Sequence, residues 1–229
     1  MSRRFEYDES SIIADILNNM PVRQVVDIGA NRGKFARKVI KHSKNKIGVL
    51  CVEPNKDAIG GFAAKQVSNN MVKILNCAVD ASESNQKFYI TNNDEFSSLK
   101  RPEDIDPMLA EKILVNAVVD VNTLTLDSIL KSHMFCSSGL NVFVKIDSQG
   151  MDYEIVEACT QLEERVCCIL TEISMSDLYS TKVDWKEHVQ MLEERGFVMA
   201  AVYQSNPGHL LKIHDINAVF INSRIKSCE

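Results

Sequence analysis

Short apolar runs alternate with amphipathic segments along most of the chain. Apolar runs of about four to eight residues predict buried strands, and apolar residues spaced three or four apart predict helices. The predicted strands span residues 25–28, 47–52, 72–77, 142–146, 166–173, 197–203 and 216–221. The predicted helices span residues 34–42, 56–64, 126–131, 153–159 and 185–195. A first helix is expected from a cap at Ser10 or Ser11 to about Met20, where Pro21 stops it.

This alternation predicts an α/β fold with a parallel sheet and helices on both faces. Right-handed crossovers make the first three strands neighbours and place a ligand crevice at their carboxyl ends. Gly196 stands where a C-cap glycine belongs, and the last two strands are expected to form a hairpin. No linker or repeat interrupts the pattern. We therefore expect residues 1–229 to form a single domain, with an N-terminal helix within residues 1–22.

Residues 80–122 break the alternation. Two short predicted strands, 87–90 and 117–121, flank the polar segment TNNDEFSSLKRPEDID. Long polar connections at the carboxyl edge of a parallel sheet usually carry function or are disordered. We interpret this region as a lid or acceptor-binding loop. A plain surface insertion is the competing interpretation.

Charge and cysteine content narrow the class of partner. The net charge is −5, which argues against general nucleic-acid binding. The basic residues of the helix after Gly33 are either its solvated face or a docking patch. No apolar stretch approaches the roughly 20 residues of a membrane helix, and the N-terminus lacks a signal-peptide core. Seven cysteines without a Cys-x-x-Cys pair are typical of buried thiols in a reducing compartment, so we expect a cytoplasmic protein.

The strongest candidate for a site combines VVDIGANRG, at residues 25–33, with Glu53 at the end of the next predicted strand. This pair is typical of a nucleoside-bearing cofactor, whose ribose is bound by the acid. A dinucleotide needs glycine where this chain has Asn31 and Lys34. The loop is better suited to S-adenosylmethionine, which carries an amino acid in place of the pyrophosphate.

Each part of this pattern is expected to meet one part of the ligand. Asp27 would contact the ammonium group directly or through water, Gly29 would let the backbone approach, and N–H groups at the helix start would bind the carboxylate. Glu53 would accept hydrogen bonds from the ribose hydroxyls, and residues 76–78 would flank the adenine. The predicted cofactor-binding residues are Asp27, Gly29, Ala30, Asn31, Gly33, Glu53, Asn55, Cys77 and Ala78.

With these residues established, the chain resembles the FkbM family of S-adenosylmethionine-dependent methyltransferases over about residues 25–220. The matching stretches are VVDIGANRGKF, VLCVEPNKDAI, ILNCAVD, FSSL, VNTLTLDSIL, VFVKIDSQGMDYEIVEA and LTEIS, of which KIDSQG is the most family-specific. The resemblance implies a class I methyltransferase fold, Rossmann-like, with a seven-stranded sheet and an antiparallel last strand. It also implies methyl transfer to a hydroxyl of a sugar, nucleotide-sugar or secondary metabolite. Two departures are Gln149, where the family often has Glu, and Ala158-Cys159 in place of Gly-Ala.

Methyl transfer to a hydroxyl requires a base near the acceptor. Asp147 ends one predicted strand and Glu172 lies near the end of the next, while Lys145 shares one side of its strand with Asp147. We predict that Asp147 is the base or the acceptor contact and that Glu172 and Lys145 support it. The competing interpretation is that Asp147 caps the next helix. A divalent metal held by the two carboxylates is a further option that we do not favour, because no third ligand is evident.

Several alternatives stay open. His188, His209 and His214 are weaker candidates for the base. Residues 147–150 lack the Asn/Asp-Pro-Pro-aromatic motif of amino-methylating enzymes, but RNA ribose methylation and a non-catalytic S-adenosylmethionine-binding module both fit. The segments expected to choose the acceptor, 91–106, 178–184 and 204–214, carry no specific motif, and neither acceptor nor oligomeric state can be read from them. The aromatic side chains suited to stacking on an acceptor are Phe96, Tyr179 and Trp185.

Overall fold

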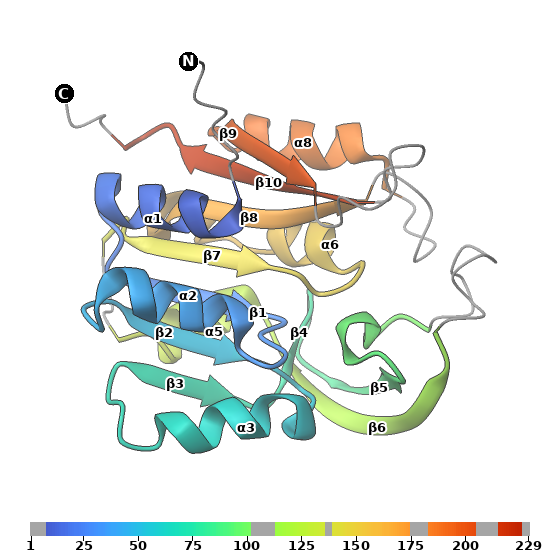
Figure 1. Cartoon of the computed structure of the whole chain (residues 1–229). Coiled ribbons are helices and arrows are strands. Elements are labelled where there is room, and N and C mark those ends of the chain that lie inside the picture. The colour runs from blue at the N-terminus through green and yellow to red at the C-terminus, as the bar shows by residue number, and fades with distance from the viewer. Residues whose placement is uncertain (1–7, 102–112, 136–138, 175–182, 205–214, 226–229) are drawn as a thin grey trace, which may run out of the picture.

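The computed structural model describes residues 8–101, 113–135, 139–174, 183–204 and 215–225. Its main sheet has seven strands in the order β3-β2-β1-β7-β8-β10-β9. The strands are β1 (Gln24–Ile28), β2 (Gly48–Val52), β3 (Val72–Leu75), β7 (Val142–Ile146), β8 (Val166–Ser174), β9 (Phe197–Gln204) and β10 (Asp215–Asn222). Strands β2, β3 and β7 end at one edge of the sheet, as Figure 1 shows.

Neighbouring strands from β3 to β8 pair in parallel, and β10 runs antiparallel to both β8 and β9. The predicted α/β class, the adjacency of the first three strands and the antiparallel last strand are therefore confirmed. Strand β3 ends at Leu75, slightly earlier than expected.

Helices cover both faces of this sheet (Figure 1). One face carries α1 (Glu9–Asn19), α2 (Lys34–Ser43) and α3 (Lys56–Gln66), and the other carries α5 (Leu126–Ser132), α6 (Asp152–Glu157), α7 (Leu162–Arg165) and α8 (Trp185–Glu194). Side chains alternate along a strand, so Val25 joins the α1–α3 core while Val26 joins the α5–α8 core. Each face of the sheet thus has its own apolar core.

The helix ends differ from the predictions at two places. Asp8 caps α1, since its carboxylate accepts a hydrogen bond from the Ser11 N–H at 2.8 Å, so neither expected serine is the cap. The expected helix 153–159 ends at Glu157, and α7 is an additional element. Asp127 holds the chain between these helices by accepting from the backbone N–H groups of Thr160 and Gln161 at 3.0 and 3.1 Å. The predicted glycine end of α8 is confirmed, because Gly196 has a φ of +80°.

The region that breaks the alternation forms a second, three-stranded sheet. It consists of β4 (Ala78–Val79), β5 (Asn85–Thr91) and β6 (Val115–Leu124), in the order β4-β6-β5, and the short 3-10 helix η1 (Asp94–Phe96) follows β5. Strands β5 and β6 are longer than the expected 87–90 and 117–121 and pair antiparallel. In Figure 1 this hairpin extends from the edge where β2, β3 and β7 end. Within the described residues, no helix is long and apolar enough to span a membrane.

Candidate active site

The loop after β1 is shaped by two glycines with positive φ. Gly29 has a φ of +69°, and a Cβ placed on it would lie 1.9 Å from the Asp147 carbonyl oxygen. Gly33, also at +69°, begins α2 where a Cβ would collide with the ring of Phe62. From the sequence, Gly29 was predicted to let the backbone approach a ligand. The structure shows a different reason for glycine at this position, because the loop packs against the backbone at the end of β7.

Glu53 follows β2 and binds this loop through its carboxylate. One carboxylate oxygen accepts from the Asn31 N–H at 2.7 Å, and the other accepts from the Asn55 N–H at 2.8 Å. Its side chain is buried, and burial raises its pKa to about 7 although both hydrogen bonds act in the opposite direction. A carboxylate has about four acceptor positions, so these two bonds leave Glu53 able to accept from hydroxyl groups.

A cavity of about 360 Å³ lies beside this loop, at the carboxyl ends of the strands. Six of the predicted cofactor residues line it, namely Gly29, Ala30, Asn31, Glu53, Cys77 and Ala78. Asn55 does not, because its side chain caps α3 by accepting from the Asp57 and Ala58 N–H groups. Gly33 acts on the loop's shape rather than on the cavity wall. The volume is within the usual range for small-molecule sites.

Asp27 and Lys145 form a buried pair beneath this cavity. They are register partners on β1 and β7, and the Lys145 Nζ lies 3.4 Å from an Asp27 carboxylate oxygen. Asp27 is fully buried, which raises its pKa to about 6, and neither oxygen accepts a hydrogen bond from the described part of the chain. Asp27 is not among the residues that line the cavity, so its predicted contact with the ammonium group, direct or through water, stays a prediction.

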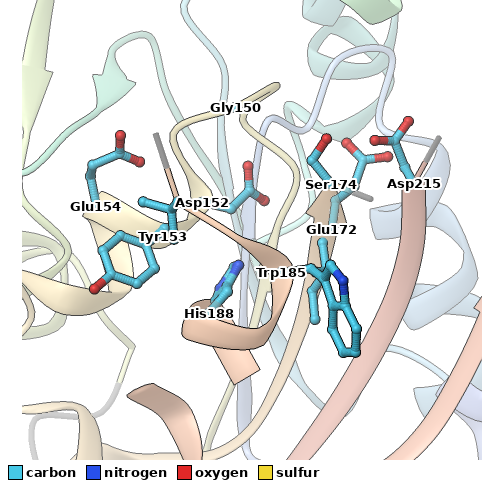
Figure 2. Close-up of a pocket in the computed structure, with 11 residues that line it drawn as sticks. Gly150, Asp152, Tyr153, Glu154, Glu172, Ser174, Trp185, His188 and Asp215 are labelled. Carbon is cyan, nitrogen blue, oxygen red and sulfur yellow. The ribbon is translucent and has the colours of Figure 1, made fainter. Parts of the chain in front are cut away.

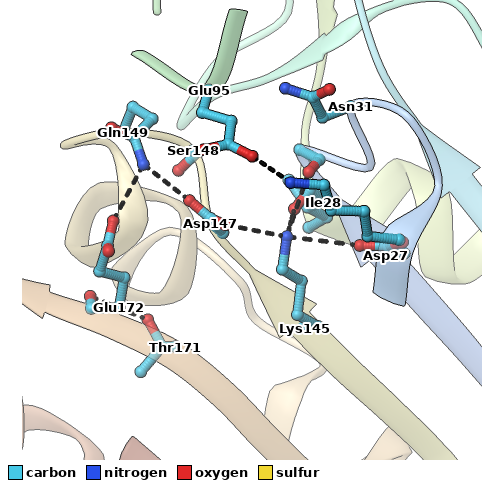
Figure 3. A network of polar contacts seen from close by, with 12 residues as sticks. Asp27, Ile28, Asn31, Glu95, Lys145, Asp147, Ser148, Gln149, Thr171 and Glu172 are labelled. Carbon is cyan, nitrogen blue, oxygen red and sulfur yellow. Dashed lines mark hydrogen bonds and ion pairs between the residues drawn. The ribbon is translucent and has the colours of Figure 1, made fainter. Parts of the chain in front are cut away.

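Lys145 connects this pair to Asp147. Its Nζ lies 3.2 Å from an Asp147 carboxylate oxygen and donates to the carbonyls of Ile28 and Gly29 at 3.3 and 3.1 Å. Burial alone would lower the pKa of Lys145, but the charges of Asp147 and Asp27 outweigh it and raise the pKa. The ammonium group therefore stays charged and fixes the position of Asp147, as Figure 3 shows.

Gln149 joins Asp147 to Glu172 (Figure 3). Its side-chain amide nitrogen donates to Asp147 at 2.8 Å and to Glu172 at 3.1 Å. Burial, together with the nearby charge of Asp147, raises the pKa of Glu172 well above its usual range. Sequence reasoning noted Gln149 only as a departure from the family pattern and missed this bridge.

The structure thus brings the three predicted catalytic residues together at one cavity wall. The carboxylate of Asp147 is 38% exposed, which leaves it accessible from the cavity. It does not cap the following helix, since α6 begins at Asp152 without a side-chain cap. The cap interpretation of Asp147 is therefore wrong.

The segment from β5 to Lys100 closes the cavity from the other side. Arg32 pairs with Asp94 at 2.8 Å, and Lys34 pairs with Glu95. Further along, the Ser98 hydroxyl donates to the carbonyl of Gln149 at 2.8 Å. These contacts place the predicted lid region over both the β1–α2 loop and the β7–α6 loop. Whether it opens stays a prediction.

A second, smaller cavity of about 40 Å³ lies between α6, α8 and the ends of β8 and β10 (Figure 2). It shares Glu172 and Asp215 with the larger cavity. Trp185, one of the predicted stacking residues, lies at its wall, whereas Phe96 lines the larger cavity and Tyr179 is outside the described residues.

Of the three histidine candidates, His188 lies within the described residues. His188 lines the smaller cavity, and burial lowers its pKa to about 4. His209 and His214 lie outside the described residues. Within the described ranges, no group of three or more His, Cys, Asp or Glu side chains is arranged to hold a metal ion.

The model of the FkbM methyltransferase domain matches residues 27–199 of this chain. The chain belongs to this family. The predicted resemblance is therefore confirmed, and with it an S-adenosylmethionine-dependent methyltransferase family and a class I fold. A comparison with curated proteins gave no match.

Solved structures agree with the fold of an FkbM domain. An FkbM methyltransferase from Methylobacillus flagellatus KT superposes with a TM-score of 0.55 at 13% identity, covering 87% of this chain and 44% of that chain. This chain therefore spans less than half the length of that protein. A fibrillarin pre-rRNA processing protein from Methanococcus jannaschii gives a TM-score of 0.51 at 11% identity, covering 89% of this chain and 67% of that chain.

Proposed function

We propose that this protein transfers a methyl group from S-adenosylmethionine to a hydroxyl of a sugar, nucleotide-sugar or secondary-metabolite acceptor. Family membership supports methyl transfer, and the arrangement of Asp147 supports a hydroxyl acceptor. Asp147 is the partly exposed carboxylate at the cavity wall, fixed by Lys145 on one oxygen and by Gln149 on the other. This fixed carboxylate is the observation that carries the proposal.

The larger cavity fits S-adenosylmethionine by its chemistry. Glu53 retains acceptor capacity for ribose hydroxyls, and Cys77, Ala78, Val79 and Phe88 provide apolar wall for an adenine ring. Lys34 and Lys38 also line the cavity, where they pair with Glu95 and Glu9, and the ligand carboxylate would compete with these acids for their charge. When bound, S-adenosylmethionine would supply an activated methyl group on a sulfonium, with S-adenosylhomocysteine as the leaving group of the in-line displacement.

The residues of this chain position the acceptor and take up its proton. In our proposal Asp147 accepts a hydrogen bond from the acceptor hydroxyl and then its proton as the oxygen is methylated. Lys145 keeps the Asp147 carboxylate in place, and Gln149 sets its distance from Glu172. Asp27 is a positioning residue here, because it reaches the site only through Lys145. A non-catalytic binding module would need neither the base nor its supports.

We place the reaction in the cytoplasm, because all cysteines in the described ranges are free and buried. RNA is not our proposed acceptor. The net charge of −5 and the carboxylates at the end of β7 and β8 oppose a phosphate backbone.

The test uses two variants of the full chain. Asp147→Asn keeps the size of the side chain and removes the base, so S-adenosylmethionine binding by calorimetry should persist while release of S-adenosylhomocysteine falls by about 10² to 10⁴-fold. Glu53→Ala should weaken S-adenosylmethionine binding itself. The acceptor screen would contain hydroxylated sugars, nucleotide-sugars and polyketide or peptide intermediates.

Each outcome has a separate meaning. Unchanged turnover of Asp147→Asn would refute the role of this carboxylate as base. Unchanged affinity of Glu53→Ala would refute the cofactor assignment. Loss of turnover on exhaustive chelation, restored by a divalent cation, would show the metal mechanism that we do not favour.

A further inference from the structure

The smaller cavity is lined by several acidic side chains. Four carboxyl side chains line it, from Asp152, Glu154, Glu172 and Asp215, and no lysine or arginine appears among its described lining residues. Glu154 has a cationic partner outside the cavity, since Lys100 lies 3.1 Å from its carboxylate. In Figure 2 the carboxylates of Glu172 and Asp215 lie next to each other above the ring of Trp185, and the carboxylate of Asp152 lies apart from them, above the ring of His188. The wall of the cavity is therefore rich in carboxyl groups.

Two polar atoms of this wall lack a partner among the described residues. Asp152 is 5% exposed, and one of its oxygens accepts from the Ser148 hydroxyl at 3.0 Å while the other accepts from no group. The Nε2 atom of His188, also 5% exposed, has no hydrogen-bond partner either. Buried polar atoms are nearly always paired. The unpartnered oxygen of Asp152 calls for a donor that enters from the cavity.

Burial makes these acids harder to ionise, and a cation seated against them would favour their charged form. Burial, followed by the charge of Asp147, raises the pKa of Asp152 to about 7, and the opposing charge of Lys145 does not outweigh them. Burial likewise raises the pKa of Asp215 to about 6. An ammonium group offers three N–H donors and a positive charge to such a wall, whereas a neutral hydroxyl offers one donor and no charge. A metal ion is disfavoured by geometry, since no suitable ligand group exists within the described part of the chain.

The position of this cavity connects it to the reaction. Glu172 and Asp215 line both cavities, and Gln149 links Glu172 to Asp147. Asp147 lies close enough to Asp152 and Asp215 for its charge to raise the pKa of both, so one small molecule can contact these acids with a charged group and Asp147 with a neighbouring hydroxyl.

We propose that the smaller cavity binds a protonated amino group of the methyl acceptor, so that the acceptor is an amino alcohol such as an amino sugar. This inference rests on the proposed function and narrows its acceptor class. Asp152 and Asp215 bind the ammonium group, and the adjacent hydroxyl is the one presented to Asp147. The acids of this cavity then determine which acceptor binds and take no part in the methyl transfer itself.

The test measures binding in matched pairs that differ by one amino group. Protein saturated with S-adenosylhomocysteine is titrated, at neutral pH, with glucosamine against glucose and with galactosamine against galactose, by calorimetry or ligand-observed NMR. At least one amino sugar should bind about tenfold or more tightly than its neutral partner, as charge-assisted bonds do. The N-acetylated sugars, which lack the charge, should bind like the neutral ones.

Asp152→Asn is the decisive variant, because asparagine can still accept from Ser148 while it removes the negative charge. Preference for the amine should disappear in this variant, and affinity for the neutral sugars should be unchanged. Glu193→Gln removes an exposed acid of α8 and is the control for net charge. It should keep the preference.

Three results would overturn the proposal: no amino sugar binds more tightly than its partner, the preference survives in Asp152→Asn, or Mg²⁺ displaces the amine with the same dependence on Asp152. The last would identify a metal site. Failure of the proposed function would look different, because the protein would still bind amines while releasing no S-adenosylhomocysteine from any acceptor.

Discussion

The two halves of the candidate site are built in contrasting ways. The donor half consists of the β1–α2 loop, Glu53 and residues 77–79, and its central contacts join Glu53 to the nearby Asn31 and Asn55. The acceptor half consists of residues 145–152, Glu172 and Asp215, and its contacts join segments far apart, such as Lys145 to Asp27. The donor half depends on contacts between segments that are close in the sequence, whereas the acceptor half depends on the register of strands that are far apart in the sequence.

The two halves also differ in the chemical groups that they offer. The donor half offers backbone groups and one carboxylate, a set suited to a ligand that many proteins share. The acceptor half places three ionisable side chains and an amide in contact, and Lys145 joins them to Asp27 of β1, so each one depends on the others. Changes in the donor half should therefore act on binding and folding, and changes in the acceptor half should act on turnover.

The largest expected effect is at Gly29, where the two halves touch. In Gly29→Ala the new Cβ would lie 1.9 Å from the Asp147 carbonyl oxygen in a backbone with a φ of +69°. We expect a loss of about 3 kcal/mol or more in the free energy of unfolding. Donor binding and turnover should both fall, because Asp147 must shift. Urea unfolding and calorimetry measure these effects.

The control is Gly61→Ala in α3. Nothing lies within 4 Å of a Cβ at this position, so alanine should stabilise the helix by about 0.5–1 kcal/mol. Equal stability of the two alanine variants would contradict the close contact between the β1–α2 loop and β7.

The fold and the donor half could be predicted from the sequence largely because their signals are local. The apolar alternation placed the strands of the main sheet, and the pairing of an acid-ended strand with a glycine loop placed Glu53 beside Asn31. The reason for Gly29 was missed, because it depends on a carbonyl more than 100 residues away. The role of Gln149 was also missed, because it depends on a contact with Glu172 of β8, which the sequence does not reveal.

The smaller cavity was beyond sequence reasoning altogether. Its acids come from α6, β8 and β10, and although Glu172 was predicted as a supporting residue, no pattern in the sequence brings these acids together. Alternation along β8 could place Glu172 on a face, but only the antiparallel register of β10 brings Asp215 opposite Ser174. The position of Asp215 therefore required the structure.

A smaller effect is expected in the pH dependence of stability, and it belongs to the donor half. Burial raises the pKa of Glu53 to about 7, above its value in the unfolded chain. The folded protein thus binds this proton more tightly, so Glu53 contributes stability below about pH 4.5 that is lost as the pH rises through about 7. Between about pH 4.5 and pH 7 the free energy of unfolding of the wild type should fall as Glu53 loses its proton. In Glu53→Gln this fall should be smaller by about 1–2 kcal/mol.

Chemical denaturation at several pH values measures this slope. The substituted side chain also places an amide nitrogen against a backbone N–H, so the variant should be less stable throughout, but that offset does not depend on pH. Glu164→Gln, which removes an exposed acid of α7, should leave the slope unchanged. A slope in Glu53→Gln as steep as that of the wild type would show that Glu53 is not the buried acid responsible.

The smallest expected effect is at Gln149 and belongs to the acceptor half. The amide nitrogen of Gln149 donates to both Asp147 and Glu172, whereas the protonated carboxyl of Gln149→Glu has one O–H and can donate to only one of them. Once ionised, the new carboxylate would repel that of Asp147. Compared with the wild type at the same pH, the variant should therefore retain most of its turnover at low pH and lose about tenfold as the pH rises past neutrality. Affinity for S-adenosylmethionine should change little, because Glu53 and the β1–α2 loop are untouched.

Gln149→Ala, which removes the bridge without adding charge, should lower turnover by a factor that does not vary with pH. If both variants gave the same pH profile, the amide of Gln149 would not be what separates the two carboxylates, and the acceptor half would not depend on it.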